Sequence, residues 1–228
     1  MTFKVFLISV FFICSLLPEV ILAQNKVVVI PLLSDRGDEI QTVTSAGRVW
    51  MDRNLGAFRV AQSEDDYQAY GWMYQWGRLA DGHEMPHSPT TTTLSSGNVP
   101  GHGDFITTSL SPYDWRDEPN DDLWQGVSGI NNPCPAGFRL PTETELEIER
   151  ASWSSNNSAG AFASPLKLVL AGNRNYSTGT VSPGGSVGSY WSSTVNGSYA
   201  LILNFGGAHT IMGSSFRAFG LSVRCIKD

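Results

Sequence analysis

Short segments in which apolar and polar residues alternate dominate the chain from residue 40 onward. Residues 40–44 and 48–51 lie on either side of a Ser45-Ala46-Gly47 turn, and this arrangement predicts a β-hairpin. Similar strand-like runs recur at residues 138–140, 190–194, 199–205 and 219–226. We expect the C-terminal runs to form antiparallel strands. In the last of them Leu221, Val223 and Cys225 share one face, which places Cys225 inward.

Helix signals are concentrated after Pro141. Thr142 and Glu145 form a capping box, and acidic residues suit the first turn of a helix. Leu146 and Trp153 then fall on one face, so a helix is predicted from about residue 143 to 153. The approximate helical spacing of aromatic residues within 64–79 also admits a short amphipathic helix. Few helices among many short strands predict the α+β class.

The N-terminal residues resemble a targeting segment. Residues 1–23 combine Lys4, an apolar run too short to span a membrane, and Ala23 at a suitable cleavage position, so they are predicted to be a signal peptide. Residues 24–39 form either a leader or an edge strand of the domain, and they contain a strand-like run at 26–33, which Pro31 confines to an edge or a strand end. No later run is long and apolar enough to span a bilayer, and the remaining domain is predicted to cover residues 40–228.

Charge and cysteine content indicate which partners and which covalent links to expect. The chain has 16% charged residues and a net charge of −6, and it has no basic stripe, so a nucleic-acid partner is not expected. Of the three cysteines, two remain after signal removal. An even number of cysteines in an exported protein predicts one disulfide, between Cys134 and Cys225.

Histidines and acidic residues gather in two polar segments. The long irregular stretch 81–104 contains three of the four histidines, and the turn 114–122 is strongly acidic. Pro86 interrupts the His83-to-His87 spacing that a helical zinc site would use. We therefore predict no metal site and no cofactor.

Six short blocks, in this order, resemble the Fibrobacter succinogenes major paralogous domain (the FISUMP domain): 49–56, 70–78, 123–126, 132–142, 190–194 and 223–225. The most specific is Asn-Pro-Cys-Pro-Ala-Gly-Phe-Arg-Leu-Pro-Thr at 132–142. The resemblance covers roughly residues 40–228. It implies a C-type-lectin-like fold in secreted or cell-surface bacterial proteins, with long irregular loops, and no settled activity.

That fold is shared with formylglycine-generating enzymes, which use a pair of reactive cysteines. Because Cys134 and Cys225 occupy fold-stapling positions, we expect no catalysis. Glu118-Pro119-Asn120 matches the calcium- and sugar-binding tripeptide of mannose-type C-type lectins, but it precedes the cysteine segment and no Trp-Asn-Asp strand follows it. A calcium site is therefore not predicted there.

The function expected from these features is non-catalytic binding of a glycan or a protein through loops on a disulfide-closed scaffold. A structural or appendage subunit of the cell surface is the alternative. Aromatic side chains can stack on sugars, although packing in the core is their commoner role. The candidate ligand contacts are Trp72, Tyr74, Trp115, Asn173, Arg174, Asn175, Tyr176, His209 and Arg217.

Overall fold

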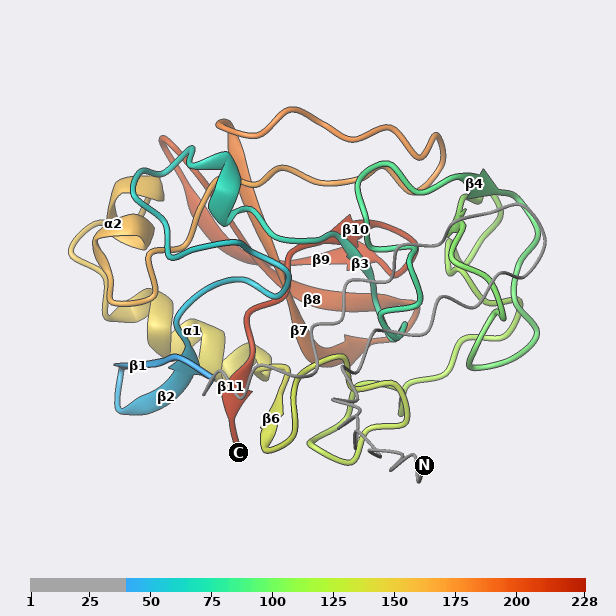
Figure 1. The fold of residues 1–228 in the computed structure, drawn as a ribbon, viewed down its shortest axis with the longest axis horizontal. Helices are drawn as coiled ribbons and strands as arrows, with labels where there is room; N and C mark the ends of the chain where they lie inside the picture. Colours follow the sequence, from blue (N-terminus) through green and yellow to red (C-terminus); the bar gives the residue numbers. More distant parts are fainter. Residues whose placement is uncertain (1–39) are drawn as a thin grey trace, which may run out of the picture. The chain divides into compact units, whose positions relative to one another are not determined.

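The three longest strands form an antiparallel meander, with strand order β7-β8-β9 (Figure 1). Its strands are β7 (Val187–Asn196), β8 (Tyr199–Gly206) and β9 (Thr210–Phe216). The computed structural model describes residues 40–228, which belong to one compact unit. The predicted signal peptide, its cleavage after Ala23 and the strand-like leader lie outside the described residues.

A second sheet brings the two ends of the described chain together, in the order β1-β2-β11-β6. The predicted hairpin is confirmed as β1 (Thr42–Ser45) and β2 (Arg48–Met51). The last strand, β11 (Ile226–Lys227), lies between β2 and β6 (Phe138–Arg139). Two small pairs complete the strands: β3 (Tyr74–Gln75) with β10 (Gly220–Leu221), and β4 (Thr90–Thr91) with β5 (Phe105–Ile106).

The helices are few and short. The predicted capping box is confirmed at the start of α1 (Glu143–Ala151), where Thr142 accepts the main-chain N–H of Glu145 and Glu145 accepts that of Thr142. Leu146 of α1 is buried against the β7-β8-β9 sheet. α2 (Ser158–Ala163) follows, capped by Asn157. The aromatic segment 64–79 contains a single 3₁₀ turn, η1 (Tyr67–Ala69), and then β3, in place of an amphipathic helix.

The predicted disulfide is confirmed. Cys134 and Cys225 are bonded, with their Cα atoms 5.9 Å apart, and they join the core that contains Leu221 and Val223. The bond therefore fastens the centre of the chain to its last strand.

These elements make a mixed α/β fold of mostly short antiparallel strands with few helices, compatible with the predicted α+β class. No helix among residues 40–228 is long and apolar enough to cross a membrane.

Candidate functional site

Four aromatic rings from separate parts of the chain meet at the surface, at the end of the sheet where β8 begins and β9 ends. We call this group, Tyr113, Tyr176, Tyr199 and Phe216, the aromatic platform. Tyr199 stacks on Phe216 at 5.2 Å between ring centroids, as expected from their cross-strand pairing. The ring centroids of Tyr113 and Tyr176 lie 4.3 and 5.1 Å from that of Phe216, and all four residues are partly exposed. Tyr199 is 41% exposed.

The loop after β5 holds Tyr113 in place. Tyr113 has φ of 62°, a left-handed conformation that costs a non-glycine residue about 1–2 kcal/mol. Two main-chain bonds fix it: its N–H donates to Leu110 at 2.8 Å, and its carbonyl accepts the N–H of Ala218 at 3.1 Å. Strained residues that the surroundings hold in place cluster at functional sites, which supports a binding role for this loop.

The second loop, residues 173–182, is held from below by a buried guanidinium. Arg174 donates to the carbonyls of Met85, Ser88 and Gly179 at 3.1, 2.7 and 2.9 Å, and its guanidinium lies 4.2 Å from the centre of the Phe105 ring. At the tip, the side-chain oxygen of Asn175 accepts the N–H groups of Ser177 and Thr178. Tyr176 is therefore carried on a loop with few free main-chain groups.

A small pocket of about 150 Å³ lies between the same two loops. Hydroxyl groups dominate its wall, which is formed by Thr92, Thr107, Thr108, Ser109, Leu110 and Ser177. The two loops are joined by a bond from the Thr108 N–H to the Tyr176 carbonyl, 2.9 Å long. The pocket thus borders the two loops that carry Tyr113 and Tyr176, and its lining residues offer uncharged hydrogen-bonding groups.

Buried charges support the platform from beneath. Arg217 follows Phe216, lies 4.7 Å from the centre of the Trp76 ring and donates to Asp121 and to the Gly197 carbonyl at 2.5 and 2.8 Å. Its Nη1 is 3.8 Å from the carboxylate of Asp114. Burial raises the pKa of Asp114 to about 6, while the main-chain N–H of Arg116 and the charge of Arg217 act in the opposite direction.

The residues predicted to contact a ligand fall into two groups, one buried and one at or near the surface. Tyr74, Trp115, Arg174 and Arg217 are each at most 2% exposed. A side chain without exposed surface cannot touch a ligand, so for these four the expected ligand contact is corrected to a role in packing and loop support. Trp115, for example, donates its indole N–H to the Trp76 carbonyl at 2.7 Å inside the core.

The other predicted contacts lie at or near the surface. Trp72 is partly buried and packs beside Tyr74. Asn173 and Asn175 belong to the loop that carries Tyr176, and all three are partly exposed. His209 is exposed but lies in the β8–β9 turn, at the opposite end of these strands from the platform. Only Tyr176 of the predicted set is a platform ring.

Sequence reasoning missed Tyr113, Tyr199 and Phe216. Tyr199 and Phe216 would have emerged from a correct pairing of β8 with β9, because that register makes them direct neighbours. The position of Tyr113 depends on a loop conformation that has no local sequence signal beyond Ser111-Pro112.

Asp81, His83 and Glu84 converge with ligand-type atoms within 4.8 Å of one another. The Nε2 atom of His83 accepts the main-chain N–H of Gln75 at 3.1 Å, so Nδ1 carries the ring proton and donates it to Asp81 at 2.7 Å. Burial lowers the pKa of His83 to about 4 and keeps the ring neutral. Both ring nitrogens are thus committed to protein groups, and the cluster serves as a hydrogen-bonded turn. The absence of a metal requirement stays a prediction.

Comparison of the chain with family models, curated proteins and solved structures finds no match.

Proposed function

We propose that this chain is a secreted or cell-surface, non-catalytic binding module of a bacterial envelope protein, with the C-type-lectin-like fold that its resemblance to the FISUMP domain implies. Its ligand is a glycan, bound at the aromatic platform and the adjoining hydroxyl pocket. The observation that carries the proposal is the joining of these two surfaces by two anchored loops.

The chemistry of the site favours a glycan. The C–H groups of a pyranose ring form an apolar face that can lie flat on a tyrosine, while its hydroxyls need uncharged donors and acceptors nearby. The platform supplies the rings, and Thr107, Thr108 and Ser177 supply hydroxyls within the pocket. Binding sites with flat aromatic anchors and a few placed polar groups are common in recognition proteins.

Anchored loops support binding because little loop entropy is lost when a ligand arrives. The disulfide is consistent with an oxidising compartment and also makes both cysteines unavailable as thiol nucleophiles. This supports binding over the chemistry of formylglycine-generating enzymes. A structural subunit of the cell surface is the second candidate function, and the open edge of β9 is the observation that favours it.

The test is a glycan array followed by titration calorimetry with the best glycan. Tyr199→Ala removes an exposed ring, and Tyr67→Ala is the matched control because Tyr67 is 74% exposed and is not a platform residue. An aromatic contact is worth about 0.5–1.5 kcal/mol, so Tyr199→Ala should weaken binding about 2- to 13-fold. Tyr67→Ala should change nothing.

Two results would overturn the proposal. One is an array with no glycan bound above background. The other is a glycan whose affinity falls with Tyr67→Ala and stays constant with Tyr199→Ala. Affinity for a protein but for no glycan would count against the assignment of the ligand class.

A further inference from the structure

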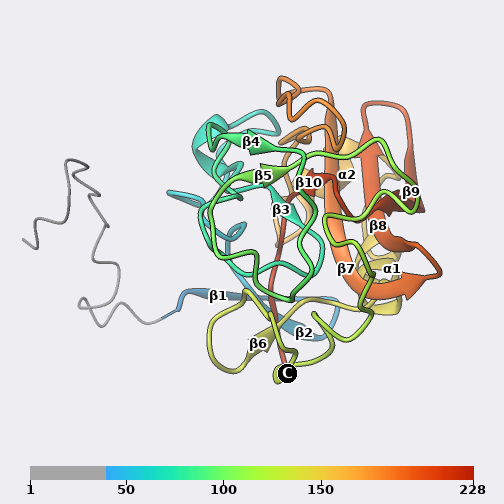
Figure 2. The same ribbon diagram turned by 90° about the vertical axis from the view of Figure 1, so that its right-hand side faces the viewer.

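β9 is an open edge of the main sheet. The opposite edge strand, β7, is covered by the C-terminal segment, since the N–H of Trp191 donates to Ser222 and the N–H of Ser222 donates to Ser189. No described strand pairs with the outer side of β9. β9 also lies at the margin of the fold in Figure 2.

The register shows which main-chain groups face outward. The N–H of Gly206 donates to His209, so this pair is hydrogen-bonded, and hydrogen-bonded pairs alternate along an antiparallel ladder. The next such pair is Asn204 with Ile211. The residues of β9 that alternate with the hydrogen-bonded positions, Thr210, Met212 and Ser214, therefore direct their N–H and carbonyl groups away from β8.

Nothing in the sequence of β9 protects this edge. Natural edge strands are commonly blunted by a charged residue, a proline or a bulge. β9 reads Thr-Ile-Met-Gly-Ser-Ser-Phe, without charge or proline, and pairs with β8 in an unbroken register. An open strand of this kind is a template for pairing with another strand.

We propose that β9 pairs with β9 of a second copy of this chain, antiparallel and about a two-fold axis through Met212. The outward residues then form hydrogen-bonded pairs with one another: Met212 lies opposite Met212 of the second copy, and Thr210 lies opposite Ser214. The two sheets become one continuous sheet. Such an interface is isologous, as in most two-fold dimers.

Side chains are self-complementary in this register. Thr210 is only 7% exposed, and its hydroxyl has no hydrogen-bond partner among the described residues. Its counterpart across the axis, Ser214, is exposed and offers a hydroxyl, and cross-strand Thr–Ser hydrogen bonds stabilise sheets. Ile211, 53% exposed, would lie opposite Gly213, and the Ile211 side chain of each copy already leans over its own Gly213, so the two isoleucines would lie near each other across the axis.

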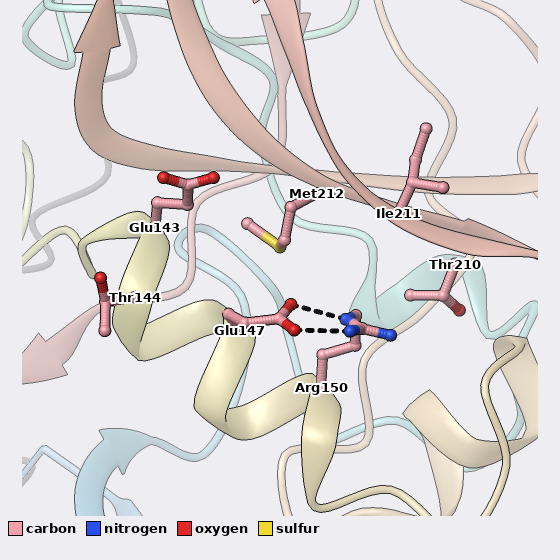
Figure 3. Close-up of a pocket in the computed structure, with 7 residues that line it drawn as sticks. All are labelled: Glu143, Thr144, Glu147, Arg150, Thr210, Ile211 and Met212. Atoms are coloured by element: carbon pink, nitrogen blue, oxygen red, sulfur yellow. Dashed lines mark hydrogen bonds and ion pairs between the residues drawn. The ribbon is translucent and has the colours of Figure 1, made fainter.

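The groove beside β9 accommodates the second strand. It has a volume of about 520 Å³ and lies between α1 and β9, with the side chain of Met212 pointing toward the helix (Figure 3). On the helix wall, Arg150 binds both carboxylate oxygens of Glu147, so this charge is compensated within the groove. The groove wall thus combines the Met212 side chain, the compensated Arg150–Glu147 pair and the carboxylate of Glu143.

Cysteine cross-linking tests the register directly. Met212→Cys places one thiol on the axis, where the two Cα atoms would be about 5.5 Å apart, within the range of a disulfide. Ser214→Cys is the matched control, since it is more exposed but about 14 Å from its own copy. Both are made with Cys14→Ser, so that the engineered thiol is the sole free cysteine.

Under mild oxidation, Met212→Cys should become a covalent dimer and Ser214→Cys should not. Equal or greater cross-linking of Ser214→Cys would overturn the proposed register. Sedimentation equilibrium of the unaltered full chain should show a dimer that dissociates on dilution, and a monomer at every concentration up to about 1 mM would overturn the interface.

A proline variant provides a second measurement. Ser214→Pro removes an outward N–H and leaves the bonds to β8 intact, whereas Ser214→Ala keeps that N–H. The dissociation constant of the dimer should rise about tenfold or more for the proline variant, and should rise less for the alanine variant. Equal constants for the two would contradict the proposal.

Discussion

Removal of the Cys134–Cys225 disulfide should produce a large loss of stability. The bond closes a loop with a sequence separation of 91 residues. The chain-entropy relation gives about 4.6 kcal/mol for such a loop, and loss of a native disulfide commonly costs about 2–5 kcal/mol. We therefore expect Cys134→Ser and Cys225→Ser each to lower the free energy of unfolding by about 3–4 kcal/mol.

The two substitutions differ in one further respect. Cys225 is fully buried, while Cys134 is partly exposed. A serine hydroxyl at 225 would have to be buried in the apolar core, which adds about 1 kcal/mol or more if it finds no partner. Cys225→Ser should therefore be somewhat less stable than Cys134→Ser. The double variant should match Cys225→Ser, because the same bond is lost only once.

Urea unfolding followed by tryptophan fluorescence measures these differences. A loss of 3–4 kcal/mol should lower the midpoint by about 1–2 M for typical urea dependences. Thiol titration of the unfolded, unreduced protein should find neither cysteine free. The reasoning would be refuted by a double variant whose loss equals the sum of the single losses, or by both thiols titrating in the unaltered protein.

Three more outcomes follow from the structure. The pKa of His83 is about 4 in the folded chain and about 6.5 in the unfolded chain, so between these pH values the unfolded state binds one more proton than the folded state. The free energy of unfolding should therefore fall by about 3 kcal/mol as the pH drops from 6.5 to 4. Urea midpoints measured across this range should depend less on pH in His83→Gln than in the unaltered protein. Thr142→Ala removes the cap of α1 and should cost about 1 kcal/mol in the same assay, whereas Thr144→Ala, on the exposed side of that helix, should cost little. Thermal melts with calcium, zinc or a chelator should coincide, and a chelator-induced drop of many degrees would contradict the hydrogen-bond assignment at His83.

Local signals in the sequence predicted the parts of the fold that depend on neighbouring residues. The hairpin at 42–51 has its turn and both strands within one short segment. The start of α1 depends on Thr142 and Glu145, which are three residues apart. The disulfide could be predicted because only two cysteines remain once the targeting segment is set aside.

The candidate site could not be predicted in this way, because its parts are brought together from distant segments. The platform combines residues 113, 176, 199 and 216, and no spacing in the sequence indicates that they meet. β9 was missed because Gly213 and the serines beside it interrupt the apolar alternation that marks a strand. Its pairing with β8 depends on the tertiary fold.

Buried arginines are the other feature that sequence patterns conceal. Arginine is mostly exposed in proteins, so its usual assignment is to the surface. Here Arg174 and Arg217 are buried because carbonyl groups of irregular loops, which no strand or helix satisfies, accept their hydrogen bonds. A guanidinium has five N–H donors in a fixed plane and can satisfy several carbonyls at once. The amino-acid composition of a loop does not indicate which of its carbonyl groups will need a buried arginine as hydrogen-bond donor.

This arrangement separates the residues that position the site from those that would contact a ligand. Arg174 holds the loop of Tyr176 through carbonyls on three other residues, so its loss would leave buried acceptors unpaired and would move that loop. Tyr199 lies on a regular strand and projects into solvent, so its loss leaves the main-chain framework intact. Substitution of Arg174 should therefore change stability and binding together, whereas substitution of Tyr199 should change binding alone. A surface of this kind can vary its contact residues without disturbing the scaffold beneath them.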